Sequence, residues 1–371
     1  MSVSGRRAAA AQPPRGGDGA PGGSGASRRL TRLLGSSLFA ARFAPIWIGL
    51  AMLFVIAAII APETLSSASF NSAILPLSAF TAIAALGQML VIMTGGIDLS
   101  MAGMITLVGS LLVGVSHSSN GRLGVAIAIC LGWAALGGLA NGILIAFGEL
   151  NPLIVTLATG EIFYGITTQY RLGTGNASGV PASLSNWALE RFLGVSWIFW
   201  VGVVLAVVVA VLLRYSARGR RFQAVGASQR AAWISGLRVR FYVLGAYVLC
   251  SMLGGVTAIM LSGLLVSPDT TLGGPYLLGP VAAVVLAGAS LLGGLASTTS
   301  TWVAAFFLLS LDQMLRVLGL SSALQYVVYG LAIIVGMLIS GDRIADVFGR
   351  FLARDQHADD DREAVHDVLQ R

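Results

Sequence analysis

Few residues in this sequence could bind a metal ion or take part in acid–base chemistry. Its three histidines, His117, His357 and His366, fall in predicted loops or in the C-terminal region, and none has a plausible partner nearby in sequence. The two cysteines, Cys130 and Cys250, lie inside long apolar runs and form no Cys-x-x-Cys pair. We therefore expect no metal site, no disulfide framework, no catalytic triad and no bound cofactor.

The basic residues are restricted in kind, because all 23 are arginine and the chain contains no lysine. A P-loop needs its lysine to reach the nucleotide phosphates, and a Schiff base needs a lysine amine. The sequence therefore holds neither kind of site, and we predict that the chain is not itself an enzyme.

Four carboxylates, Asp98, Glu149, Glu161 and Asp312, lie in or beside apolar segments. An ionised group inside a membrane is costly and is usually functional. We expect Asp98 to cap the helix that follows it by accepting hydrogen bonds from free backbone N–H groups; solute contact and a proton relay are the alternatives. Glu149 is expected in a solvated turn, and Glu161 should pair or face the bundle interior. Asp312 should pair with Arg316, four residues later.

The composition indicates what kind of protein must position these groups. Hydrophobic residues make up 56% of the 371 residues and charged residues 11%, whereas soluble domains carry roughly 25% charged residues. We predict an all-α polytopic membrane bundle of about ten transmembrane helices, some short or broken. The apolar runs are 44–61, 74–93, 101–115, 125–147, 153–170, 197–213, 241–266, 277–292, 301–315 and 324–339.

The chain divides into three regions by composition. Residues 1–42 are rich in glycine, proline and arginine and are predicted to form a disordered basic tail. Residues 43–340 hold the apolar runs, and residues 341–371 form a C-terminal tail. Nineteen of the 23 arginines lie in 1–42, in the loop 214–240 or after 340. The positive-inside rule then predicts that this loop and both termini are cytoplasmic.

Two glycine-containing segments stand at corresponding places in the two halves of the chain. The first is Gly95–Ser100, which precedes the short run 101–115, and the second is Gly273–Tyr276, which precedes 277–292. With five runs per half, such segments would be related by inversion, as in many transporters. Glycine-mediated helix packing is the alternative explanation.

The loop 214–240 contains seven arginines and no acidic residue. Its alternation of apolar and polar residues predicts a short amphipathic helix over about 221–237, with Phe222, Val225, Ala232 and Ile234 on the apolar face. Such a face suits docking onto a cytoplasmic partner. A helix lying on anionic lipid is the alternative.

Four stretches resemble the permease subunits of bacterial ABC importers for ribose, xylose, arabinose, galactose and related compounds. They are GGIDLSMAGMITLVGSLL at 95–112, NGILIAFGELNPLIVTLATGEIFYGI at 141–166, GRRFQAVGASQRAAWISGL at 219–237 and GPVAAVVLAGASLLGG at 279–294. The resemblance runs in order from about residue 44 to 340. It implies that 219–237 is the coupling helix that seats in a groove of an ATPase subunit.

Two sets of site residues follow. Those expected to couple to the ATPase are Gly219, Arg220, Phe222, Val225, Gly226, Ala231, Ala232, Ser235 and Gly236. Those expected along the translocation pathway are Asp98, Ser100, Asn141, Asn151 and Thr156.

The resemblance implies the transmembrane permease of an ATP-driven importer for a monosaccharide or a similar small polar solute, in the bacterial inner membrane. The implied partners are a separate ABC ATPase subunit, a periplasmic or lipid-anchored solute-binding protein, a second permease chain and the lipid bilayer, but no nucleic acid. The solute stays open, since nucleosides and autoinducers also fall within the family's range. An ion- or proton-coupled secondary transporter is the main alternative, and a non-transporting membrane scaffold is a third.

Overall fold

The computed structural model describes residues 43–174, 179–294, 296–321, 323–325, 327–328, 330–331 and 334. The predicted basic tail 1–42, the C-terminal tail and His357 and His366 lie outside the described residues. The last predicted apolar run, 324–339, also lies largely outside them.

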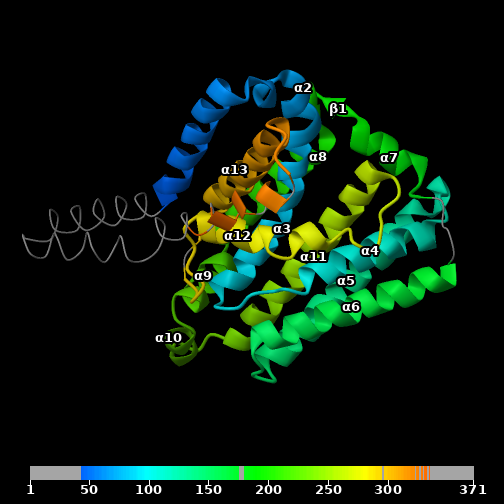
Figure 1. Cartoon of the computed structure of the whole chain (residues 1–371). Coiled ribbons are helices and arrows are strands. Elements are labelled where there is room, and N and C mark those ends of the chain that lie inside the picture. The colour runs from blue at the N-terminus through cyan, green and yellow to red at the C-terminus, as the bar shows by residue number, and fades with distance from the viewer. Residues whose placement is uncertain are drawn as a thin grey trace, which may run out of the picture. The chain divides into compact units, whose positions relative to one another are not determined.

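The described part of the chain is almost entirely helical, which confirms the predicted fold class (Figure 1). After the helix Phe43–Ile60, α2 (Ser67–Ser69) leads through a π-helical turn at Phe70–Ile74 into α3. The following helices are α3 (Leu75–Met93), α4 (Met101–Ser116), α5 (Leu123–Ala146), α6 (Pro152–Thr174), α7 (Ala182–Leu189), α8 (Trp197–Tyr215), α9 (Ala217–Ala227), α10 (Gln229–Ile234), α11 (Val239–Leu265), α12 (Gly279–Leu286) and α13 (Thr298–Val317). Single 3-10 turns stand at Pro62–Leu65, Asn120–Arg122 and Gly274–Tyr276, and one hairpin pairs β1 (Arg191–Phe192) with β2 (Val195–Ser196).

Each of the first nine predicted apolar runs contains a helix. Within the described residues, five helices are long and apolar enough to cross a membrane: Phe43–Ile60, Ser67–Met93, Asn120–Ala146, Trp197–Tyr215 and Val239–Leu265. The helices α4 and α12 are apolar but shorter. The prediction for 277–292 was wrong in extent, because α12 ends at Leu286 and irregular backbone follows.

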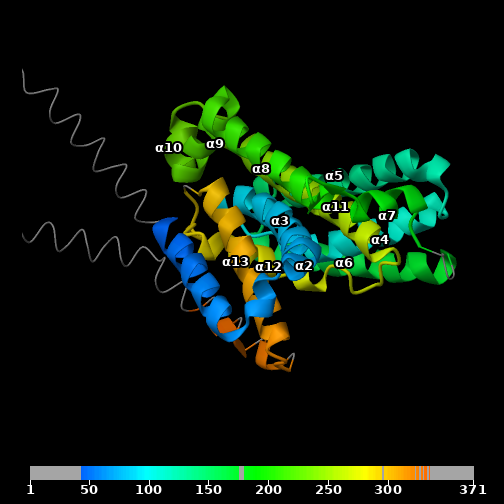
Figure 2. The same cartoon turned by 90° about the horizontal axis from the view of Figure 1, so that it is seen from above.

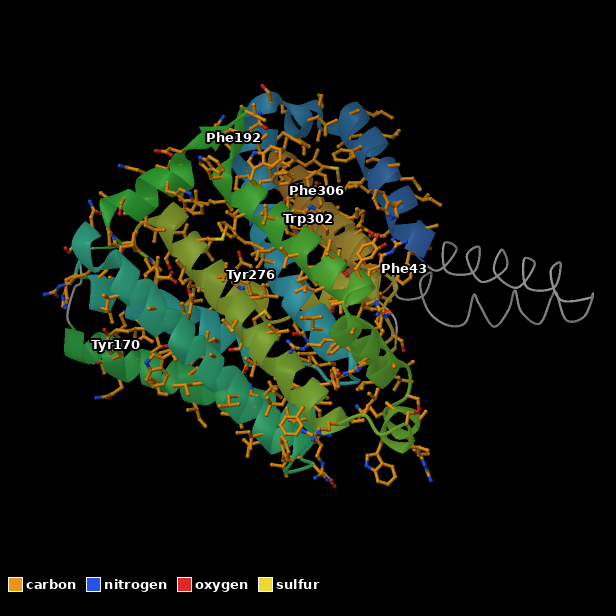
Figure 3. All side chains as sticks on the ribbon, turned by 180° about the vertical axis from the view of Figure 1, so that it is seen from behind. Phe43, Tyr170, Phe192, Tyr276, Trp302 and Phe306 are labelled. Carbon is orange, nitrogen blue, oxygen red and sulfur yellow. The ribbon has the colours of Figure 1, made fainter. Side chains whose placement is uncertain are left out.

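Helix α3 lies at the centre of the bundle. Its side chains are buried on all sides, as expected for a helix that is apolar around its whole circumference. It packs against α8, α11, α12 and α13, and Figure 2 shows it between α8 and α13. Aromatic side chains join the outer elements: the Phe306 ring on α13 lies 5.9 Å from that of Phe54 and 5.8 Å from that of Phe70 (Figure 3).

The close packing of α5 on α11 depends on two glycines four residues apart. A Cβ atom at Gly138 would lie 2.6 Å from the carbonyl oxygen of Tyr247, and one at Gly142 would lie 2.9 Å from the Cα of Leu244. This is the Gly-x-x-x-Gly pattern that lets membrane helices approach backbone to backbone. Similarly, Gly103 of α4 contacts the backbone of Gly160 on α6.

Helix α7 and the hairpin, which the sequence did not predict, lie away from α9 and α10 (Figure 1). Helix α7 packs on the C-terminal part of α11, where a Cβ at Gly263 would lie 3.0 Å from Leu184. The paired helices α9 and α10 lie at the other end of α11 (Figures 1 and 2). Both α7 and the hairpin are short and only weakly periodic, so hydrophobic patterning gives little signal for them.

Candidate functional site: a clamped linker and the segment that lies on it

The connection between α3 and α4, residues 94–100, is irregular backbone enclosed by the bundle. The side-chain amide of Gln88 faces the backbone of Asp98. Oriented to satisfy both groups, it donates to the Asp98 carbonyl at 3.1 Å and accepts from the Asp98 N–H at 3.0 Å. The Tyr247 hydroxyl lies against Gly96, where a side chain would collide with it. Buried N–H and C=O groups need partners, and Gln88 supplies them here.

A chain of buried side-chain hydrogen bonds begins at the end of this linker. Ser100 donates to Asp98 Oδ1 through its N–H (3.0 Å) and through its hydroxyl (2.6 Å). Asn141 of α5 donates to Ser100 Oγ at 2.8 Å, and Thr159 of α6 donates to Asn141 Oδ1 at 2.7 Å. Asp98, Ser100 and Asn141 are almost completely buried. The chain therefore ties the linker to α5 and α6 through polar contacts that are buried from Asp98 to Asn141 and partly buried at Thr159.

The expected role of Asp98 at the start of α4 is confirmed in part, because its Oδ1 accepts the backbone N–H of Ser100. Ser100 itself occupies the N-cap position and its side chain makes no capping bond, while Asp98 stands two residues earlier and uses Oδ1 to bind Ser100. Its second carboxylate oxygen has no hydrogen-bond partner among the described residues.

The structure brings together four of the five residues expected along the pathway. Thr156 of α6 donates to the carbonyl of Ile97 at 3.3 Å, and so reaches the same linker that holds Asp98 and Ser100. Asn151 lies apart: it is exposed and accepts from the Leu153 N–H at 2.9 Å, at the start of α6. The assignment of these residues to a translocation pathway stays a prediction.

Sequence reasoning missed Gln88, Thr159 and Tyr247 as members of this site. Gln88 is the one amide inside the 74–93 run, and a buried amide needs a partner. That signal could have found it. Nothing in the spacing of Thr159 or Tyr247 indicates which neighbour either would meet.

The segment predicted as one helix over 221–237 is two helices joined at Ser228, so that prediction was wrong. Ser228 is extended, at φ −163° and ψ 108°, and its Oγ accepts from the Ala231 N–H at 3.2 Å. Ser216 caps α9 in the same way, accepting from the Gly219 N–H at 2.8 Å. Gly236, at φ +80°, ends α10 in the left-handed conformation that glycine adopts without strain.

The expected apolar docking face is mostly turned inward. Phe222, Val225 and Ala232 are buried within this chain, at 8%, 0% and 4% exposure. Their prediction as surface residues is corrected: a charge at Val225 would disturb the fold before any partner. The exposed apolar side chains on α10 are Trp233 and Ile234, each 71% exposed.

The other residues expected to couple take different positions. Arg220, Ala231, Ser235 and Gly236 are exposed. Gly219 lies against the backbone of Leu212 and Leu213 at the end of α8, where only glycine fits.

Three segments that are distant in sequence meet where α9 joins α10: the end of α3, the last helical turn of α9 at Gly226 and the backbone at Gly294. A Cβ at Gly226 would lie 2.8 Å from the Met93 carbonyl oxygen and 3.2 Å from that of Gly294. Gly294 donates its N–H to the same Met93 oxygen at 3.2 Å. Gln229, the first residue of α10, donates from Nε2 to the Thr94 carbonyl at 2.7 Å. The surface segment thus rests directly on the end of α3 and the start of the linker.

The two segments that looked like internal repeats lie on neighbouring elements. Gly273 donates its N–H to Thr106 Oγ1 of α4 at 3.0 Å and packs against the Ala102 carbonyl. The second glycine segment therefore packs on the helix that the first one opens.

A cavity of about 990 Å³ lies beside this junction. Its lining includes Thr94, Gly96 and Tyr247 on the inner side and Gln229 and Trp233 of α10 on the outer side.

The remaining carboxylates can now be assigned. Glu149 is exposed, as expected, and pairs with Arg240 at 2.6 Å. The predicted pair of Asp312 with Arg316 is confirmed at 2.9 Å. The expectation for Glu161 was wrong, because this residue is exposed on α6 and forms no ion pair with any of the described residues.

Comparison with known proteins identifies the family of the chain, which the geometry alone does not show. The family model described as branched-chain amino acid transport system / permease component matches residues 71–337. The chain belongs to this permease family. Among its relatives, the ribose import permease of Bacillus subtilis is 33% identical over 81% of this chain and 92% of its own length.

Two further relatives have comparable identity. An L-arabinose ABC transporter permease of Azospirillum brasilense is 31% identical, over 77% of this chain and 84% of its own length. An autoinducer 2 import system permease of Salmonella paratyphi B is 30% identical, over 74% and 78%. No solved structure gives a significant match. The permease is therefore a multi-pass membrane protein, in agreement with its apolar helices.

The role of Asp98 can be tested by changing its charge without changing its shape. In Asp98→Asn the amide oxygen still accepts from Ser100, so we expect this variant to keep most of the transport activity and thermal stability of the wild type. Asp98→Leu leaves the Ser100 hydroxyl without its acceptor and should lose about 1–3 kcal/mol of stability. Solute uptake and thermal unfolding of the purified permease provide the measurements. A well-expressed Asp98→Asn protein without transport would instead indicate that the negative charge itself is needed.

Proposed function

We propose that this permease is the membrane-spanning subunit of an ATP-driven importer for a monosaccharide or a similar small polar solute. The observation that carries the proposal is the similarity to an import permease for ribose, which extends over 92% of that protein. The relatives for L-arabinose and autoinducer 2 support the same class of solute. All three are import or ABC transporter permeases, which argues against a secondary transporter.

ATP hydrolysis would take place on a separate ABC subunit, because this chain has no lysine with which to build a P-loop. A solute-binding protein outside the inner membrane would deliver the solute. This division leaves the permease two tasks, to provide a path through the bilayer and to respond to the ATPase.

The ATPase would dock on α10. Trp233 and Ile234 are exposed there, and a large exposed aromatic side chain beside an aliphatic one is typical of the centre of a protein interface. The neighbouring Ala231 and Ser235 would complete the contact, and Arg220 and Arg230 would lie near its rim. The buried Phe222, Val225 and Ala232 would support this surface from below.

A second permease chain would cover the outer face of α6. Glu161 is exposed about midway along this helix, with Thr168 and Gln169 exposed further on. A carboxylate at such a position is costly against lipid. Contact of Glu161 with polar groups of a second chain would remove that cost.

The arginine distribution supports an orientation with α9, α10 and both termini in the cytoplasm. The test uses a variant lacking Cys130 and Cys250, with either Arg221→Cys on α9 or Ser183→Cys on α7. An impermeant thiol reagent added to intact cells should label the cysteine at 183 and should reach the one at 221 only after the membrane is opened. The reverse pattern would invert the proposed orientation.

The energy source separates the proposed importer from a secondary transporter. Cells expressing the permease with its ATPase should lose uptake of labelled solute when ATP is depleted. They should keep it when an uncoupler abolishes the proton gradient while ATP is maintained. Uptake that stops with the uncoupler alone would refute ATP-driven import.

Docking on α10 predicts a selective loss of the ATPase. Trp233→Ala and Ile234→Asp should leave the permease folded, because both side chains are exposed, but should weaken ATPase binding by about 2 kcal/mol or more. Co-purification of the two subunits measures this.

Leu193→Asp is the matched control for docking. Leu193 is 78% exposed, lies on the hairpin turn far from α10 in sequence, and has φ +54°, which aspartate tolerates. This variant should retain the ATPase. Normal ATPase stoichiometry in both α10 variants would exclude α10 as the docking surface.

A further inference from the structure

The bond from Gln229 to Thr94 joins two parts of the molecule with different surroundings. Gln229 opens α10, on the surface, and its Nε2 lies 2.7 Å from the Thr94 carbonyl oxygen. Thr94 is the C-cap of α3 and is buried. Its carbonyl belongs to the last turn of a helix, where backbone acceptors lack intrahelical partners. Gln229, on the surface, therefore supplies the hydrogen bond that the buried Thr94 carbonyl needs.

The backbone around this bond leaves little room for independent movement. Gly226 packs against the Met93 and Gly294 carbonyls, and Gly293 would place a Cβ 3.3 Å from the Gly95 nitrogen. These are backbone-to-backbone contacts, with no flexible side chain between them to absorb a displacement. A shift of α9 and α10 therefore has to move the end of α3 or break these contacts.

Both the middle and the far end of the linker are held, so a shift at its start would be passed inward. Gln88 binds the backbone of Asp98, and Ser100 is bonded to Asp98, to Asn141 and through it to Thr159. Ser100 is also the N-cap of α4. Displacement of the linker would change how α4 meets α5 and α6 at these hydrogen bonds.

We propose that the linker 94–100 is the relay between the surface segment α9–α10 and the buried polar chain, and that Gln229 is the positioning residue that joins them. The inference rests on the proposed function, since the ATPase is what moves α10. The route runs from α10 through Gln229 and Thr94 into the linker. It continues from Ser100 to α5 and α6.

The chain offers a matched control in Gln223. This glutamine lies on α9 and also donates from Nε2 to a backbone carbonyl, that of Leu213, at 3.1 Å. Its bond stays at the corner between α8 and α9 and does not touch the linker. Loss of Gln223 removes a similar hydrogen bond from the same segment without cutting the relay.

The test compares Gln229→Ala, Gln229→Glu and Gln223→Ala in the full complex, reconstituted with its ATPase and binding protein. Glutamate has nearly the size of glutamine but cannot donate when ionised. Both Gln229 variants should assemble normally and hydrolyse ATP. Their uptake of solute per ATP hydrolysed should fall on the order of fivefold, the effect expected for one hydrogen bond that couples two sites. Gln223→Ala should keep the wild-type ratio.

Hydrogen–deuterium exchange in the permease without its ATPase gives a second readout. Amides of residues 94–100 should exchange faster in both Gln229 variants and at the wild-type rate in Gln223→Ala. Unchanged exchange in the Gln229 variants would overturn the relay.

The outcomes for the complex separate the two proposals. ATP-driven uptake with an unchanged ratio in the Gln229 variants would overturn the relay and leave the proposed function standing. Loss of the ATPase from these variants would assign Gln229 to the docking surface and also overturn the relay. Absence of ATP-driven uptake in the wild type would overturn the proposed function, and the relay with it.

Discussion

Irregular backbone inside an apolar bundle has to find hydrogen-bond partners within the protein, because lipid offers none. The linker between α3 and α4 meets this constraint through Gln88, which binds the backbone of Asp98 on both sides. Ser100 and Asn141 continue the pairing into α5. Much of the site follows from this requirement, since Gln88, Ser100, Asn141 and Thr159 each bond the linker or a residue that bonds it.

Close approach of backbones is the second determinant of the fold. Hydrophobic burial alone gives little preference for one helix neighbour over another inside a membrane, where lipid is as apolar as leucine. Gly138 and Gly142 allow α5 to contact the backbone of α11, and Gly103 allows α4 to contact α6. The same device is used at the surface, where Gly226 brings α9 onto the end of α3. The glycines of the coupling segment therefore serve contact with the bundle as well as the turning of the chain.

The segment α9–α10 has two faces. The inner face carries Phe222, Val225 and Ala232 and belongs to the core of this chain. The outer face carries Trp233 and Ile234 and has no neighbour among the described residues that buries them. A segment whose inner face is fixed to the bundle and whose outer face is open can pass on a movement imposed from outside. The bond from Gln229 to the Thr94 carbonyl is one of the contacts that fix the inner face.

The class of the protein and the positions of its main helices could be predicted from the sequence. Apolar runs of membrane length and few charges are local properties, and they predicted the fold class correctly. The i,i+4 spacing of Asp312 and Arg316 is local too, and it predicted their ion pair. Local pattern also contained the signal of Ser228 as a helix cap, which the prediction of one helix overlooked. Which side of a surface helix faces inward could not be read in this way, because α9 and α10 expose and bury apolar residues alike. The burial of Val225, the exposure of Trp233 and Glu161, and the bond from Gln229 to Thr94 became apparent from the folded structure alone. The physical reason is that these outcomes depend on contacts between segments far apart in sequence, whereas hydrophobic periodicity reports only that a helix has an apolar side.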